Sequence, residues 1–483
     1  MPVQQELEAP AVTRHRPLFR AAARRSNPPL RRTDITVTDE TAVKRAVKAA
    51  ALGNAMEWFD FGIYSYLAVT IGKVFFPSGN DTAQLLSSFA TFAAAFLVRP
   101  LGGMVFGPLG DRIGRKKVLS LTMIMMASST LAIGLIPGYQ SIHFWAPVLL
   151  IVFRMLQGFS TGGEYGGAST FIAEYAPDRR RGFFGSFLEF GTLIGYTAAA
   201  GLITVLTVTL SDSSMESWGW RIPFLVAGPI GLVGLYMRLK LDETPAFQKL
   251  ESEGALENRE STPFRQILTT QWRPMVLCIA LVAAFNVTDY MLLSYMPTYL
   301  SNSIGYDSTD ALVSIIIVMV VLMAAITFVG RLSDRIGRKP VMMTGSIGFL
   351  VLSVPCFLLI KMGTVVSVFA GLLILGLCLL PYVSVMSSSL PALFPTDVRY
   401  GSLSIAFNIS VSLFGGTTPL VVEGLVSGTG NDMMPAYYTM LAALVGVIAV
   451  VTMKETARRP LPGSPPSVST AEEAAELVAS SRA

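Results

Sequence analysis

Ionisable side chains lie inside two long apolar stretches, where a charge is costly. Glu57 and Asp60 stand three residues apart in the first stretch, and Arg154 and Glu164 stand in a later one, 144–174. On a helix, Glu57 and Arg154 would each lie about nine residues, or ~14 Å, from one helix end. A carboxylate near the centre of a membrane is expensive unless it is protonated, paired or hydrated. Either acid could therefore carry a proton; a structural pair with another helix is the alternative.

Arg154 needs an anionic partner in such an environment. The partner could be an acid of the first stretch, Glu164, or the carboxylate of a bound molecule, whose two oxygens match the fork of a guanidinium group. A permanent structural ion pair is the alternative to a binding role. Gly158 and Gly162 in the same stretch predict close contact with a neighbouring helix.

Polar residues on the same helix faces extend these two clusters. At 100° per residue, Asn54 and Tyr64 share a face with the two acids of the first stretch. The apolar stretch 274–300 occupies the same place in the second half of the chain as the first stretch, 48–76, does in the first half. Asp289 in 274–300 could hold the amine end of a zwitterion. The candidate proton-coupling residues are Glu57, Asp60 and Glu164. The candidate binding residues are Asn54, Tyr64, Arg154, Gln157, Tyr165, Asn286, Asp289 and Tyr290.

Aromatic rings accompany these polar residues along the chain, Trp58, Phe61 and Phe96 among them. The face of an aromatic ring attracts a quaternary ammonium group, so such rings could hold a cation of that kind. For any one ring, packing against lipid or against the protein core is the simpler interpretation.

The composition is that of a protein with many membrane-spanning helices. Of its 483 residues, 52% are apolar and only 14% are charged, whereas soluble proteins carry about 25% charged residues. Spans of about 20 residues account for such an apolar content, and twelve apolar segments are present. The sequence therefore predicts an all-α polytopic membrane protein. Its segments are 48–76, 85–108, 117–137, 144–174, 183–209, 220–240, 274–300, 311–331, 340–361, 364–392, 400–425 and 434–453.

Basic residues predict the orientation of these segments. They concentrate in the connections after the even-numbered segments, so the positive-inside rule places both termini on the cytoplasmic side. The expected organisation is a basic, unstructured arm (1–45), a six-helix bundle (46–240), a cytoplasmic linker (241–273), a second six-helix bundle (274–455) and a short cytoplasmic tail (456–483). Arginines of the arm are expected to contact anionic lipid.

The two halves of the chain repeat each other. After their first residue, both 110–116 and 333–339 read Asp-Arg-Ile-Gly-Arg-Lys. Glu189 and Asn408 stand at matching positions and are interpreted as polar contacts between helices. The repeated loops predict a cytoplasmic gate, in which an acid pairs with an arginine or with a helix N-terminus. The gate residues are Asp111, Arg112, Gly114, Arg115, Asp334, Arg335, Gly337 and Arg338.

Few residues are available for other chemistry. The two histidines lie outside the centres of the spans, and the three cysteines lie inside apolar segments. The sequence contains no metal-binding cluster, no nucleophile–base set and no phosphate-binding G-x-x-x-x-G-K-[ST] motif. We therefore expect no enzymatic activity, no metal or other cofactor, no nucleic acid and no obligate protein partner, with the proton as the coupling ion.

The loop 107–116 resembles the signature loop of the major facilitator superfamily. Further stretches resemble the metabolite:proton symporter family within it; they are 52–61, 99–103, 157–165, 218–224 and 243–247. Stretches 286–288, 291–300 and 434–438 are most similar to the members that carry proline and betaine. The resemblance implies a major facilitator fold, with two pseudo-symmetric six-helix halves and a site between them. It also implies symport with protons by alternating access in the bacterial inner membrane.

The expected substrate is a small zwitterion such as proline or glycine betaine. An organic anion such as α-ketoglutarate is the nearest alternative. It would need a second cation near the centre, and Arg99 and Arg331 are expected nearer the cytoplasmic face. A protein that senses a ligand without transporting it is a weaker alternative, because the acids and both loop motifs are present.

Overall fold

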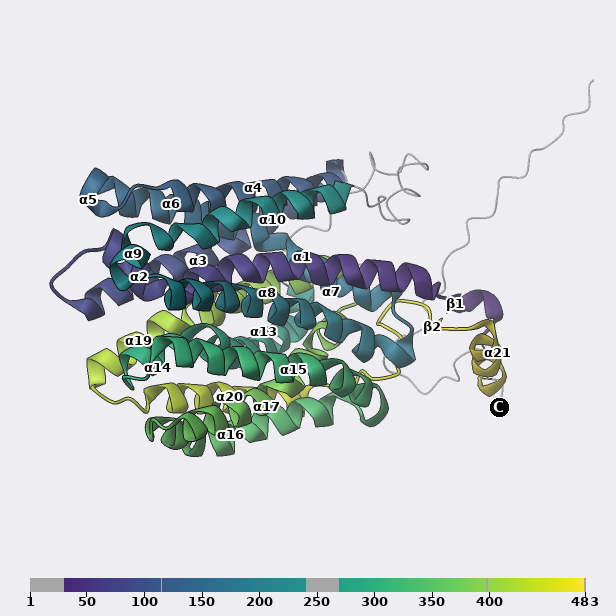
Figure 1. Ribbon diagram of the computed structural model, residues 1–483. Coiled ribbons are helices and arrows are strands. Elements are labelled where there is room, and N and C mark those ends of the chain that lie inside the picture. The colour runs from purple at the N-terminus through teal and green to yellow at the C-terminus, as the bar shows by residue number, and fades with distance from the viewer. Residues whose placement is uncertain (1–29, 114, 240–268, 397, 482–483) are drawn as a thin grey trace, which may run out of the picture.

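The computed structural model describes residues 30–113, 115–239, 269–396 and 398–481 as a bundle of long, roughly parallel helices (Figure 1). The first and the last described residues lie at the same end of the bundle, which we name the terminal end (Figure 1). Most of the expected arm (1–45) and of the expected linker (241–273) lies outside the described residues.

The first half of the described chain forms six long helical segments. They are α1 (Glu40–Tyr66) with α2 (Ala68–Phe75), α3 (Asp81–Ile113), α4 (Arg115–Leu135), α6 (Trp145–Ser160) with η2 (Thr161–Gly163) and α7 (Glu164–Tyr175), α8 (Arg181–Thr209), and α10 (Arg221–Leu239). Short elements between them are α5 (Tyr139–Ile142), η3 (Asp178–Arg180), α9 (Asp212–Ser214) and η4 (Met215–Gly219). The first helix begins before residue 46 because Asp39 caps it, accepting the Thr41 N–H at 2.9 Å.

The second half repeats this plan. Its segments are α13 (Trp272–Asp289) with η5 (Tyr290–Tyr295) and α14 (Met296–Asn302), α15 (Ser308–Ile336), α16 (Arg338–Lys361), α17 (Val365–Ser389), α18 (Arg399–Ser410) with η7 (Val411–Gly415) and α19 (Thr418–Thr429), and α20 (Met434–Thr452). A short η6 (Pro391–Leu393) precedes α18. The described residues therefore contain the twelve expected segments in the expected order.

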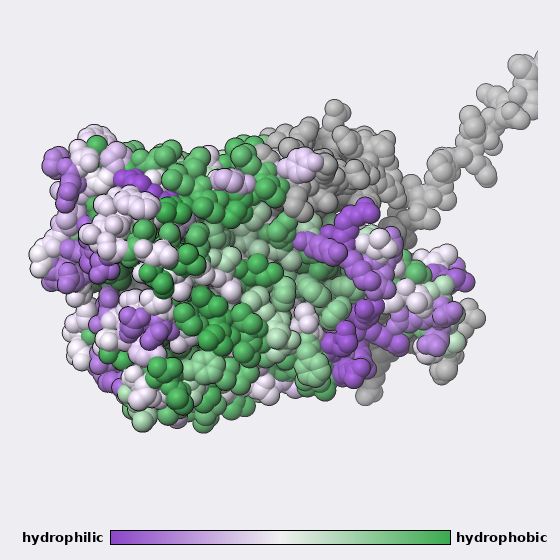
Figure 2. Space-filling view, in the orientation of Figure 1, coloured by the Kyte–Doolittle hydropathy of each residue, from purple (hydrophilic) through white to green (hydrophobic). Residues whose placement is uncertain are grey.

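The outer surface of the bundle is apolar across its middle. Figure 2 shows a hydrophobic belt between two hydrophilic ends, and large apolar side chains such as Phe328, Leu232 and Ile448 are exposed. Eight of the described helices are each long and apolar enough to cross a membrane. Apolar exposure on this scale is stable only against lipid. The chain is a multi-pass membrane protein.

Glycines bring α3 and α6 into backbone contact. A Cβ on Gly158 would overlap the carbonyl oxygen of Ala95, and a Cβ on Gly162 would overlap that of Arg99. Only hydrogen fits at either position. The predicted close contact of Gly158 and Gly162 with a neighbouring helix is confirmed, and it fixes the position of Arg99 beside η2.

The two halves contact each other towards both ends of the bundle. At the terminal end, the Asp334 carboxylate accepts the backbone N–H groups of Gly182 (2.7 Å) and Phe183 (2.9 Å) at the start of α8. Unpaired N–H groups and the helix dipole favour an anion there. Nearer the opposite end, the Ser65 hydroxyl donates to the Ser294 carbonyl oxygen (2.7 Å). The halves are therefore joined on both sides of the bundle centre.

The two repeated gate loops are described to different extents. In the second copy, Arg338 lies 3.7 Å from Asp334 and donates to the Ser388 carbonyl oxygen (3.1 Å), while Arg335 is exposed. In the first copy, Asp111 and Arg112 belong to α3 and Arg115 begins α4. Gly114 lies outside the described residues.

The residues after α20 form a folded strap along the terminal end (453–481). Arg181 donates to the Arg459 carbonyl oxygen (3.0 Å), and Arg399 donates to that of Pro462 (2.8 Å), so the strap touches both halves. Further on, β2 (Ser467–Val468) pairs in parallel with β1 (Thr36–Val37), next to η1 (Arg32–Asp34) and α21 (Ala471–Ser480). The residues expected as a short tail and the end of the expected arm thus form one small unit.

Gly337, between α15 and α16, adopts a backbone conformation that only glycine tolerates. Its φ is 107° and its ψ is 152°, and a Cβ would lie 2.6 Å from Glu455 Oε2. We expect Gly337→Ala to destabilise the protein by about 1–3 kcal/mol, measured by thermal unfolding of the purified protein in detergent. Gly424→Ala, a helical position with open space around it, is the matched control and should be neutral or slightly stabilising. Equal losses in the two variants would contradict the assignment.

Glu455 caps the start of α16. Its carboxylate accepts the backbone N–H groups of Arg338 and Lys339 (3.0 Å each) and of Thr456 and Ala457 (2.8 Å each). Burial acts to raise the pKa of Glu455, but these hydrogen bonds outweigh it and hold the pKa below its ordinary value. A lowered pKa adds stability at neutral pH, which is lost as the pH falls through the folded-state pKa.

We therefore expect Glu455→Gln to lower the thermal midpoint at neutral pH. The difference from the parent protein should shrink progressively as the pH falls below about 4 and through the lowered folded-state pKa, because the parent carboxylate then becomes protonated as well. The measurement is thermal unfolding across a pH series, with the exposed Glu472→Gln as control. A difference that stays constant with pH would contradict the cap.

Candidate functional site

A buried ion pair joins α1 and α3. Arg99 Nη2 lies 2.9 Å from Glu57 Oε1, and the two side chains are 1% and 2% exposed. The guanidinium group also lies 5.8 Å and 5.5 Å from the ring centroids of Phe61 and Phe96. From the sequence, Arg99 is expected nearer the cytoplasmic face than the central acids; the structure brings it into direct contact with one of them, Glu57. Because α3 runs from Asp81 to Ile113, Arg99 lies close to the middle of this helix.

A second buried network runs from Asp60 to Arg154. Asp60 Oδ2 accepts a hydrogen bond from Thr130 (2.8 Å), and Thr130 Oγ1 accepts one from Gln157 Nε2 (2.7 Å). Arg154 Nη1 in turn donates to Gln157 Oε1. The Arg154 guanidinium lies over the ring of Tyr64, 4.2 Å from its centroid. This acid and this arginine are thus linked through two neutral side chains.

The structure separates the two acids that the sequence could not distinguish. Glu57 contacts its arginine directly, whereas Asp60 reaches Arg154 only through intermediates. Both arginines keep further donors: Nε and Nη1 of Arg99, and Nε and Nη2 of Arg154, have no hydrogen-bond partner among the described residues. Each arginine can therefore bind an added anion, such as the carboxylate of a small molecule, which for Arg99 would be a second anion beside Glu57.

Two other candidates hold helices together. Asn54 donates to the Leu188 carbonyl oxygen (2.8 Å) and to Thr192 Oγ1 (2.6 Å), which joins α1 to α8. Tyr165 donates to Glu189 (2.6 Å), and Asn408 donates to the Gly162 carbonyl oxygen. The interpretation of Glu189 and Asn408 as polar contacts between helices is confirmed.

Glu164 lies apart from the cluster around Arg154. It begins α7 and is half-buried. About ten residues of helix, or ~15 Å, separate it from Arg154. The structure therefore does not bring these two charges together, although they share one apolar segment.

An aromatic cluster lies where α1 and α8 of the first half meet α13 and η5 of the second. It comprises Trp58, Tyr66, Tyr196, Asp289 and Tyr290. The Trp58 ring centroid lies 5.3 Å from that of Tyr196 and 5.6 Å from that of Tyr290, and Tyr66 lies 6.1 Å from Tyr196. The three tyrosines lie within electrostatic range of the Asp289 carboxylate.

Several polar atoms in and beside this cluster are buried without a hydrogen-bond partner in the described part of the chain. They are Asp289 Oδ1, Asn286 Nδ2 and the hydroxyl groups of Tyr66, Tyr196 and Tyr290. The sequence reasoning found Asn286, Asp289 and Tyr290 but missed Tyr66 and Tyr196. No spacing rule connects these two tyrosines to α13, because only the packing of three helices brings them there.

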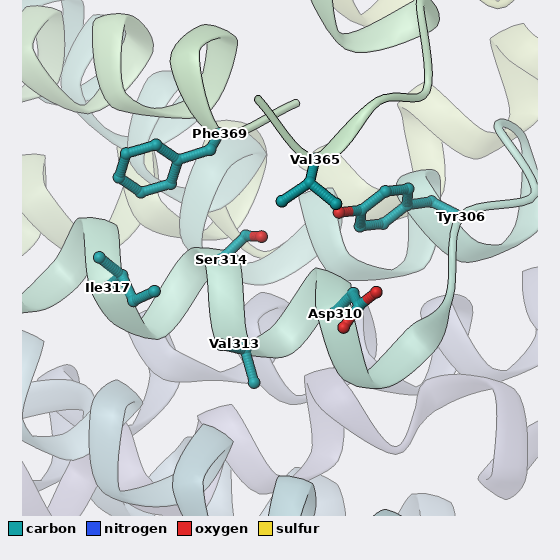
Figure 3. A pocket seen from close by; sticks show the side chains of 7 residues that line it. All are labelled: Tyr306, Asp310, Val313, Ser314, Ile317, Val365 and Phe369. Carbon is teal, nitrogen blue, oxygen red and sulfur yellow. The ribbon is translucent and has the colours of Figure 1, made fainter. Parts of the chain in front are cut away.

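A surface hollow lies elsewhere, at the N-terminal parts of α15 and α17 (Figure 3). It is lined by Tyr306, Asp310, Val313, Ser314, Ile317, Val365 and Phe369. Its acidic residue, Asp310, is exposed, and its other side chains are largely apolar. This hollow lacks the buried opposite charges of the bundle centre, so the centre is the better candidate site.

The family model described as Major Facilitator Superfamily matches residues 50–419. The chain belongs to this superfamily. It is 48% identical over 457 residues to the proline/betaine transporter of Escherichia coli (strain K12), covering 93% of this chain and 91% of that protein. It is 45% identical over 465 residues to the ectoine/proline transporter of Corynebacterium glutamicum, covering 94% and 92%. The resemblance inferred from the sequence motifs is confirmed.

Solved structures of the superfamily share the fold. The xylose transporter XylE from E. coli, in a partially occluded inward open conformation, matches with a TM-score of 0.69 over 87% of this chain and 100% of that chain. XylE bound to 6-bromo-6-deoxy-D-glucose matches with a TM-score of 0.68 over 88% and 98%. The sequence identity is 17% in both cases, so the likeness concerns the fold alone.

We expect Glu57→Gln to destabilise this protein more than Arg99→Gln does. Removing one partner of a buried ion pair costs about 3–5 kcal/mol when the other charge stays uncompensated. An orphaned Glu57 can take up a proton, whereas an orphaned Arg99 cannot lose one. The measurement is thermal unfolding of the purified variants in detergent at neutral pH.

The double variant Glu57→Gln/Arg99→Gln removes both charges and should recover much of the stability that Glu57→Gln loses. Lys361→Gln is the control, because its ion pair with Asp432 is exposed and should contribute about 1 kcal/mol or less. Fully additive losses in the double variant would contradict a coupled pair.

Proposed function

We propose that this protein is a proton-coupled symporter that imports a small zwitterionic osmolyte, such as proline or glycine betaine, by alternating access. The observation that carries this proposal is the buried Glu57–Arg99 pair with its spare guanidinium donors. The relatives named as proline/betaine and ectoine/proline transporters support the substrate class. A zwitterion presents a carboxylate that Arg99 can bind and a positive end that a carboxylate or aromatic rings can bind.

Coupling of proton uptake to substrate binding would arise because Glu57 and the substrate carboxylate compete for Arg99. Without substrate, Glu57 balances the charge of Arg99. A substrate carboxylate at Nε and Nη1 would give the arginine a second anion, and two carboxylates on one buried arginine leave an uncompensated negative charge. Glu57 then takes up a proton, so substrate and proton bind together. The loaded centre is again neutral, which permits the halves to move around it.

When the halves move, the contacts between them at one end of the bundle would break while those at the other end stay intact. Opening of the terminal end separates Asp334 from the start of α8, and opening of the other end separates Ser65 from Ser294. Domain rocking around a fixed central site is the usual form of alternating access. We assign Asp111 and its loop the same role as Asp334, on the basis of the repeat.

We also propose that the terminal end faces the cytoplasm of a bacterium across its inner membrane. The basic connections lie at this end; Arg179, Arg180, Arg335 and Lys339 belong to the described part of them. Positive connections favour the cytoplasmic side, where anionic lipid head groups attract them.

An organic anion such as α-ketoglutarate is the second candidate substrate. One observation favours it: Arg99 is buried near the middle of α3, and Arg154 is buried as well. Arg99 would then supply the second cation that a substrate with two carboxylates needs. Asp289 argues for a zwitterion instead, because it adds an acid to the same region.

Purified protein in liposomes with an inward proton gradient should accumulate labelled proline and glycine betaine. Glu57→Gln should lose this accumulation but keep the exchange of labelled for unlabelled substrate, because glutamine mimics a protonated glutamate. The variant is purified with substrate present, whose carboxylate then compensates Arg99. Uptake is measured against an equal amount of folded protein.

Asp60→Asn, measured in parallel, identifies the proton carrier. If only this variant loses accumulation while keeping exchange, Asp60 carries the proton and Glu57 does not. Accumulation of α-ketoglutarate alone would show that the substrate is an organic anion and not a zwitterion. Failure of a proton gradient to drive any of these substrates would overturn symport.

A further inference from the structure

We propose that the aromatic cluster of Trp58, Tyr66, Tyr196, Asp289 and Tyr290 binds the ammonium end of the substrate. We further infer that its hydroxyl groups recognise an ammonium that carries N–H groups, whereas its ring faces recognise a fully methylated one. This proposal rests on the proposed transport of a zwitterion and adds the residues that would select among zwitterions.

The hydroxyl groups of the cluster differ from those of other buried tyrosines. Elsewhere in the bundle, the hydroxyl groups of Tyr64, Tyr165, Tyr295, Tyr299 and Tyr382 are all hydrogen-bonded to protein groups. Those of Tyr66, Tyr196 and Tyr290 have no such partner within the described residues. A buried polar group without a partner costs about 1–3 kcal/mol, so three such hydroxyl groups on rings that pack into one cluster point to a binding site.

Charges of both signs lie near Tyr290, as the two ends of a zwitterion require. Tyr290 lies within electrostatic range of both Asp289 and Arg99. Its ring contacts Phe96 at 5.5 Å between centroids, and Arg99 lies 5.5 Å from that same Phe96 ring. An ammonium beside Asp289 and a carboxylate at Arg99 would therefore compensate opposite charges of the protein.

The cluster also lies at the right place in the fold. Trp58, Tyr66 and Tyr196 belong to the first half, and Asp289 and Tyr290 belong to the second. A molecule held among them would touch both halves, as a substrate must if its binding is to favour closure of the halves around it.

Two substrates would use this cluster differently. The ammonium of proline carries two N–H groups, which can donate to the tyrosine hydroxyl oxygens and to Asp289. Glycine betaine carries three methyl groups and no N–H, so it cannot donate a conventional hydrogen bond. It would instead be held by the ring faces of Trp58 and the tyrosines and by the charge of Asp289.

Tyr196→Phe tests the hydroxyl separately from the ring. It should raise the KM for proline about tenfold, the effect of one lost hydrogen bond to a charged group, and leave the KM for glycine betaine within about twofold. Tyr196→Leu removes the ring as well and should raise both KM values about tenfold or more. Asp289→Asn should also weaken both substrates, because both carry a positive charge.

Tyr66→Phe repeats the test at a second hydroxyl, in case Tyr196→Phe does not fold. Tyr382→Phe is the matched control: it removes a buried hydroxyl that contacts Ser346 and should leave the ratio of the two KM values unchanged. Each variant is also measured for thermal stabilisation by each substrate, which reports binding without transport.

The outcomes separate this proposal from the proposed function. If the parent protein accumulates neither proline nor glycine betaine, the proposed function fails, and this proposal fails with it. If the parent transports both, but the hydroxyl and ring variants change the two KM values by the same factor or not at all, only the present proposal is overturned. A loss confined to proline in both Phe variants, with loss of both substrates in Tyr196→Leu, supports it.

Discussion

The cost of burying charge in an apolar environment constrains the centre of this protein more than any other interaction. Glu57 and Arg99 are almost fully buried and lie 2.9 Å apart. Neither would be stable there alone, since an isolated ion in a medium of low dielectric constant loses most of its hydration energy. In the proposed mechanism, the charge state of the centre would depend on what occupies it, and this dependence would couple a proton to a substrate that carries a carboxylate.

The surrounding fold fixes the position of the Glu57–Arg99 pair along the length of the bundle. Gly158 and Gly162 let α3 approach α6 until their backbones touch, and the length of α3 places Arg99 near the middle of the helix. Phe61 and Phe96 pack beside the guanidinium and keep the environment apolar. The glycines at the contact between the helices and the phenylalanines around the guanidinium group thus both help to fix the position of the ion pair.

Contacts between the halves lie on both sides of this charged centre. Asp334 binds the start of α8 at the terminal end, and Ser65 binds Ser294 nearer the other end. The strap after α20 adds hydrogen bonds from Arg181 and Arg399, one from each half. Apolar and aromatic contacts, such as the stacked rings of Tyr165 and Phe407, also join the halves, so movement of one half against the other changes both kinds of contact.

The sequence by itself determined the membrane class, the twelve helical segments, the duplication and the presence of central acids. Apolar runs and repeated loops are local patterns, so they can be recognised in the order of the residues without knowledge of the tertiary structure. The tertiary structure alone decided which partners these residues meet. Glu57 pairs with Arg99, Asp60 reaches Arg154 through Thr130 and Gln157, and the rings of Tyr66 and Tyr196 pack in one cluster with Trp58 and Tyr290. These contacts join helices far apart in the chain, and their partners depend on how the helices are packed and rotated, which no periodicity within a single helix specifies.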